Sequence, residues 1–116
     1  LKPVQQSWSE NTAIEWVRVH NVPDYAFFDH SAHVTRGVGC SSCHGRVDQM
    51  EKVTLVESLS MGWCLECHRN PDEHLRPLDK ITDMNWKALD NELFLAEQIK
   101  KDRRIDPPTD CTGCHR

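Results

Sequence analysis

The clearest periodic pattern in the chain is an apolar stripe in its last third. Hydrophobic side chains recur there three or four residues apart, at Trp86, Leu89, Leu93, Ala96 and Ile99. This spacing places them on one face of an α-helix, so it predicts one longer helix over residues 85–104. Asp83 or Asn85 can cap its start, the basic residues near its end suit the helix dipole, and Pro107 and Pro108 stop it.

Elsewhere the pattern is short and irregular. Apolar and polar residues alternate over residues 14–19, which predicts a short strand or an arm laid on a partner. Residues 53–56 read as another brief strand. Ser58 or Ser60 can cap a short helix that runs through Trp63 into the residues that follow. The sequence therefore predicts a mainly α fold with much irregular structure.

The composition of the chain provides few apolar side chains for a hydrophobic core. It has 116 residues, 38% of them hydrophobic, and a mean hydropathy of −0.64. Such a chain forms a single thin-cored domain unless something else fills the interior. The net charge of −4 argues against nucleic acid as a partner, and no apolar run is long enough to span a bilayer. Because the chain starts at Leu1, we expect an upstream segment that was cleaved or left out.

All the cysteines fall into one repeated motif, C-x-x-C-H. The three copies are Cys40-Ser-Ser-Cys43-His44, Cys64-Leu-Glu-Cys67-His68 and Cys111-Thr-Gly-Cys114-His115. This motif is typical of c-type haem attachment: two thiols at this spacing reach the two vinyl groups of one porphyrin, and the next histidine is its proximal iron ligand. Three covalently attached haems would then supply the missing core.

Other interpretations of the cysteines explain less. The first four match the upper edge of zinc-ribbon spacing, but this leaves Cys111 and Cys114 unused. A disulfide framework gives no reason for a histidine after each pair. A thioredoxin-like redox pair needs a βαβ context that the pattern lacks.

Four histidines remain after the three proximal ones, and each is a candidate for the sixth position of an iron. They are His20, His30, His33 and His74. His30 and His33 lie three residues apart after two phenylalanines; on a helical turn they would point to the same side and could serve two haems. Met50, Met61 and Met84 are the weaker candidates, because methionine more often fills gaps in packing.

The motifs divide the single domain, residues 1–116, into three parts. Residues 1–24 form an amino-terminal arm, residues 25–74 the first two haem units, and residues 75–116 the helix and the third haem unit. Four candidate ligands exceed three irons by one, so either one histidine is not a ligand or it serves a haem outside these residues.

The element Phe28-x-His30-x-x-His33 ahead of the first C-x-x-C-H motif resembles the class III multihaem cytochromes of the c₃ and c₇ type. In that family the first histidine ligates the haem that follows and the second ligates another haem. The resemblance implies a small class III-type fold, with His30 serving the haem at Cys40 and Cys43. For His33 we expect the haem of the third motif.

A second resemblance covers most of the chain from Trp16 onward. RVHNVPDYAFFDHSAHV, LSMGWCLECHRNPDEHLRP and DPPTDCTGCHR are similar to the carboxy-terminal part of the multihaem cytochrome c subunit of alternative complex III, a bacterial quinol-oxidising membrane assembly. That subunit family carries five haems and a membrane helix, of which this chain would hold the last three haems.

The two resemblances imply an electron carrier rather than an enzyme, with no small-molecule substrate of its own. Iron-sulfur and cytochrome subunits of the complex would be its partners, together with haems on a preceding segment. Thioether attachment implies the periplasmic side of the membrane, with anchoring through that segment or through partner subunits. A free periplasmic triheme shuttle and a small haem reductase are the alternatives.

Overall fold

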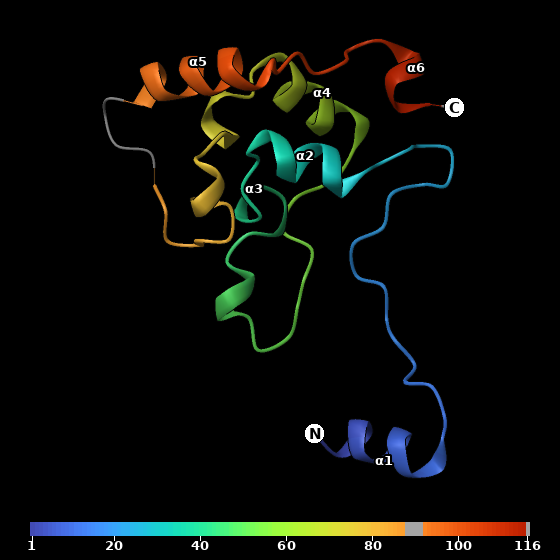
Figure 1. The fold of residues 1–116 in the computed structure, drawn as a ribbon. Coiled ribbons are helices and arrows are strands. Elements are labelled where there is room, and N and C mark those ends of the chain that lie inside the picture. The colour runs from blue at the N-terminus through green and yellow to red at the C-terminus, as the bar shows by residue number, and fades with distance from the viewer. Residues whose placement is uncertain (88–91, 116) are drawn as a thin grey trace.

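The computed structural model of the protein describes residues 1–87 and 92–115, which form short helices joined by long irregular segments (Figure 1). The helices in chain order are α1 Lys2–Glu10, α2 His30–Arg36, α3 Ser41–His44, η1 Val47–Gln49, α4 Met61–Arg69, η2 Asp72–His74, η3 Leu78–Lys80, α5 Glu92–Arg103 and α6 Cys111–Cys114. Within these residues, strand-like pairing is limited to an isolated bridge between Val38 and Leu75. The prediction of a mainly α fold with much irregular structure is confirmed.

The prediction of a brief strand over residues 53–56 is wrong, and of the two alternatives for residues 14–19, a strand or an arm laid on a partner, the strand is wrong. Residues 14–19 and 53–56 are irregular and pair with no neighbouring strand in the described structure. Alternation alone does not make a strand, because a strand also needs a partner for its main-chain hydrogen bonds. The helix α1, which precedes the first of these segments, was not predicted.

The long helix starts later than its apolar stripe suggests. Instead of capping a helix, the Asp83 carboxylate accepts a hydrogen bond from Asn85 N at 3.0 Å, and Trp86 N donates to the Asp83 carbonyl at 3.2 Å. These bonds close a turn, and the helix α5 is described from Glu92 onward. Leu89 and the side chain of Leu93 lie outside the described residues, whereas Ala96 and Ile99 are buried as the stripe predicts.

Helix α5 ends before the prolines. Arg104 takes the left-handed conformation with φ of 50°, and Ile105 N reaches back to the Lys100 carbonyl at 2.9 Å. This arrangement satisfies carbonyls of the last helical turn, as a Schellman ending does. The chain therefore leaves the helix three residues ahead of Pro107.

The packed part of the molecule lies where α5 meets residues 71–81. Its buried apolar side chains are Leu75, Ile81, Ala96 and Ile99. Residues 37–39 lie against residues 74–76, since Arg76 N donates to the Gly37 carbonyl at 2.9 Å and Gly39 N donates to the His74 carbonyl at 3.2 Å. An ion pair of 2.6 Å between Lys100 and Asp72 adds a link from α5 to η2.

Outside this small core the chain is open. Its accessible surface is 9304 Å², whereas a compact protein of this mass exposes about 6500 Å². Its radius of gyration is 17.2 Å, against about 13 Å for a compact chain of this length. The polypeptide alone does not fill its own interior, in agreement with its low apolar content.

The amino-terminal arm accounts for part of this openness. Helix α1 stands away from the other helices at the end of a long irregular segment (Figure 1). Trp8 is 88% exposed and Trp16 is 84% exposed, and Leu1 and Val4 are also exposed on the arm. Among the described residues, no helix combines the length and the hydropathy that crossing a membrane requires.

Gly39 provides a test of the packed region. A methyl group at this position would collide with the Arg76 guanidinium, which is buried and cannot swing aside. We expect Gly39→Ala to destabilise the haem-loaded protein by about 1–3 kcal/mol, measured by thermal unfolding. Gly62→Ala is the matched control, because a methyl group there meets no atom within 4 Å. The loss of stability caused by Gly39→Ala should largely disappear in an Arg76→Ala background. A loss that persists there would contradict the collision.

Candidate haem-binding site

Hydrogen bonds hold the start of each C-x-x-C-H motif in place. Cys40 N donates to the Ile81 carbonyl at 3.1 Å, which ties the first motif to the packed region. Ser60 caps α4, as predicted, by accepting from Trp63 N at 3.3 Å. The Ser60 cap fixes where α4 starts, so the second motif has a defined place in its helix.

The third motif is capped by Asp110. Its carboxylate accepts hydrogen bonds from Thr112 N at 3.0 Å, from Gly113 N at 3.1 Å and from the Thr112 hydroxyl at 2.6 Å. The Thr112 and Gly113 bonds hold the pKa of Asp110 below its ordinary value. Gly113, inside the motif, lies close to Pro108. A Cβ atom at position 113 would be 2.6 Å from Pro108 Cβ, so glycine permits this close approach of the two segments.

The cysteines of different motifs lie near one another. Burial, then the neighbouring Cys67 and Cys64, raises the pKa of Cys43 to about 11. Burial also raises the pKa of Cys67, and burial with the nearby Cys114 raises that of Cys64. None of the six cysteines forms a disulfide.

Helix α2 carries both histidines of the F-x-H-x-x-H element. Asp29 caps it by accepting from Ser31 N at 2.8 Å, so the helix starts at His30. The Phe28 ring lies against both imidazoles, with centroid distances of 4.8 Å to His30 and 4.7 Å to His33. The helical turn that the sequence suggested is therefore present.

The two histidines of α2 face histidines of two different motifs. The His30 and His44 ring centroids are 6.2 Å apart, and those of His33 and His68 are 6.1 Å apart. Two imidazoles on opposite sides of one metal ion, with bonds of about 2 Å, have centroids about 6 Å apart. His33 thus lies beside His68 of the second motif, whereas we expected it to serve the haem of the third motif; the iron that it serves stays a prediction.

Three of the imidazoles are oriented by main-chain carbonyls. The Nδ1 atoms of His33, His68 and His115 lie 2.8, 2.7 and 3.0 Å from the carbonyl oxygens of Asp29, Pro108 and Tyr25. A carbonyl only accepts, so Nδ1 is the donor in each ring. In the neutral ring the lone pair is then on Nε2, which is the form that binds a metal.

His20 and His74 occupy less defined positions. The His20 ring lies edge-on to His44 with a centroid distance of 4.5 Å, which is too short for an iron between them. His20 Nε2 is buried and has no hydrogen-bond partner, so this nitrogen is available to bind a metal or to form a hydrogen bond. His74 is half-buried in η2.

His44 is kept in its neutral form by its surroundings. Burial is the largest cause that lowers its pKa, and the neighbouring His20 and His30 lower it further. A neutral imidazole is the form that ligates a metal. The first motif therefore presents a histidine suited to iron.

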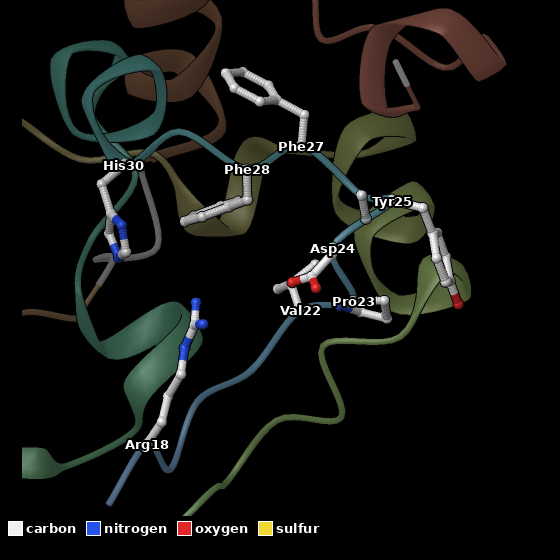
Figure 2. Close-up of a pocket in the computed structure, with 9 residues that line it drawn as sticks. Arg18, Val22, Pro23, Asp24, Tyr25, Phe27, Phe28 and His30 are labelled. Atoms are coloured by element: carbon white, nitrogen blue, oxygen red, sulfur yellow. The ribbon is translucent and has the colours of Figure 1, made fainter. Parts of the chain in front are cut away.

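A hollow of about 420 Å³ opens between the arm and α2. Figure 2 shows the Arg18 and His30 side chains directed into it, while Tyr25 turns away. Arg18 was missed from the sequence, because an isolated arginine in a polar segment carries no pattern of its own.

The described residues bring together no group of three histidine, cysteine or acidic side chains that could hold a metal ion by themselves. What they present is different: paired imidazoles at metal-spanning distance, a buried unpaired Nε2 atom and pairs of thiols on short helical turns. These features fit a cofactor that brings its own iron and needs axial ligands and thioether attachment.

The comparisons with known proteins agree with this site. Residues 32–116 match the family Cytochrome c3, a range that contains all three motifs, His33 and His74. No curated protein matches the chain. The match covers most of the chain, and the helical and irregular fold agrees with it. The chain therefore belongs to the cytochrome c3 family, whose members are multihaem electron carriers with c-type haems.

Proposed function

We propose that the protein carries electrons through three covalently attached haems, one for each C-x-x-C-H motif. Cys40 with Cys43, Cys64 with Cys67, and Cys111 with Cys114 would form the thioethers, and His44, His68 and His115 would be the proximal ligands. The observation that carries the proposal is the pairing of His30 with His44 and of His33 with His68 at 6.2 and 6.1 Å.

Two axial imidazoles leave an iron with no open position for a substrate. A haem held in this way gains and loses an electron with little change in its ligands, which suits electron transfer rather than catalysis. In this protein α2 would supply the second ligand to two haems at once. Because His30 and His33 are one helical turn apart, both irons would be held close to the same short helix.

The third haem takes its second ligand from His20 or His74. His20 is favoured by its buried, unpaired Nε2 atom. His74 is favoured by its place in the matched part of the chain. The histidine left over could serve a haem on a preceding segment.

The proposal extends to a place in a membrane complex. The sequence resembles the multihaem subunit of alternative complex III, so we place the protein on the periplasmic side of the membrane with iron-sulfur and cytochrome subunits as partners. The exposed apolar side chains of the arm, Leu1, Val4 and Trp8, support a partner at this end of the molecule. A preceding segment or these subunits would anchor it.

A free periplasmic triheme carrier is the alternative, because family membership fits it equally well. In that case three haems are the whole complement and the arm binds no partner subunit. A small haem reductase fits less well, since an open iron position is needed for its substrate and the two close imidazole pairs would fill such positions.

Haem content tests the central proposal. The intact mass of the mature protein should exceed the polypeptide mass by three haems, and the optical and EPR spectra should be low-spin throughout. Replacing both Cys111 and Cys114 by alanine should remove one haem and leave the other two low-spin. Fewer than three haems would contradict the attachment assignment, and a substantial five-coordinate, high-spin fraction would favour the reductase.

The two histidines of α2 should act on different haems. His30→Gln and His33→Gln should each convert about one third of the low-spin EPR signal to a high-spin or altered form. Adding His30→Gln to a variant without Cys40 and Cys43 should change nothing further, because its haem is already gone. Val34→Ala, at an exposed position of the same helix, is the control. If both substitutions altered the same haem, the pairing would be wrong.

The place in a complex is tested by isolating the protein from native membranes. We expect it to co-purify with quinol-oxidising activity and with iron-sulfur and cytochrome subunits. Replacing Val4 and Trp8 by serine should reduce the co-purified fraction at least tenfold while three haems are retained. A three-haem protein that is soluble and unassociated in its native source would establish the free carrier instead.

A further inference from the structure

Arg76 is the one buried charged residue in the described part of the chain. It is 5% exposed, and its guanidinium donates to Ser41 Oγ at 3.1 Å and to the main-chain carbonyl of Asp83 at 3.2 Å. Its Nε atom is buried without a partner. None of the ion pairs found among the described residues includes Arg76.

The charge of Arg76 persists despite its burial. Burial lowers its pKa, while Cys40 and Asp83 oppose this effect, but an arginine keeps its proton in proteins. The guanidinium also lies over the Trp86 ring, 4.9 Å from its centroid, and a desolvated cation over an aromatic face is favourable. The structure therefore holds a fixed positive charge in a place of low dielectric constant.

This charge lies beside the first C-x-x-C-H motif. A methyl group at Gly39 would collide with the guanidinium, and Ser41 accepts a hydrogen bond from it. The guanidinium thus contacts the residues on both sides of Cys40, the first haem-attaching cysteine. No other buried cation was found near the motifs in the described structure.

A buried cation favours the reduced form of a haem next to it, because reduction adds one negative charge. The interaction weakens with distance and with solvent screening. The haem attached at Cys40 and Cys43 would therefore feel Arg76 more than the others do. Exposed arginines such as Arg46, which is paired with Asp48 at 2.8 Å, would be screened and neutralised.

We propose that Arg76 raises the reduction potential of the first haem above the value that this haem would have without the buried charge. The inference rests on the proposed three-haem function and adds to it that the first haem holds an electron for a larger fraction of the time than it would without Arg76. Arg76 is a positioning residue in this scheme, acting through its charge and not by ligating iron.

The test is an optical redox titration of the haem-loaded protein, analysed as three one-electron steps. Arg76→Gln, which keeps amide donors for Ser41 and the Asp83 carbonyl but removes the charge, should lower one potential by the equivalent of about a tenfold change in the reduction equilibrium, about 59 mV. The other two potentials should move less. Arg76→Lys, measured with the wild type at about pH 5, where even a buried lysine is largely protonated, should restore most of the difference. Arg46→Gln is the matched control on the surface.

Three outcomes would overturn the inference: unchanged potentials in Arg76→Gln, an equal shift of all three potentials, or a shift in Arg76→Lys as large as in Arg76→Gln. If Arg76→Gln does not retain haem, Arg76→Met fills the same apolar space and replaces it. Haem content and the low-spin spectrum are measured on the same samples. A wild-type protein without three haems would refute the proposed function, whereas three haems with unshifted potentials would refute the role of Arg76 alone.

Discussion

The polypeptide buries too few apolar side chains to form a complete core, and the other features of the structure follow from this constraint. Four buried hydrophobic side chains, Leu75, Ile81, Ala96 and Ile99, form the described core, and they lie on one flank where α5 meets residues 71–81. The motif helices and the histidines lie outside this core and are mostly half-exposed. In a c-type cytochrome the porphyrins complete the interior, so the cofactor is a structural element as much as a reactive one.

The arrangement of α2 links this structural role to electron transfer. One helix of seven residues, capped by Asp29 and ended at Gly37, presents one histidine toward the first motif and one toward the second. The Phe28 ring contacts both imidazoles. If both imidazoles bind iron, the separation of the two haems is set by the pitch of a single helical turn, which leaves little freedom for it to change.

Much of the site could be predicted from the sequence, because covalent attachment leaves a local signature. The C-x-x-C-H motifs, the Ser60 cap and the helical placement of His30 and His33 all depend on neighbours within a few residues. The neighbour of His33 could not be predicted, since it depends on a contact between segments that are distant in the sequence. Trp86 belongs to the apolar stripe by spacing, yet it lies in a turn and packs on Arg76. Nothing in the sequence distinguishes Arg76 from the other charged residues of its polar segment.

The imidazole contacts to main-chain carbonyls also bear on how the family can diversify. His33, His68 and His115 are oriented by the carbonyls of Asp29, Pro108 and Tyr25, and every residue type has a carbonyl. Substitution at Pro108 or Tyr25 therefore does not remove the acceptor as long as the chain keeps its path. A relative that keeps this backbone route could therefore change these side chains without losing the carbonyls that orient its imidazoles.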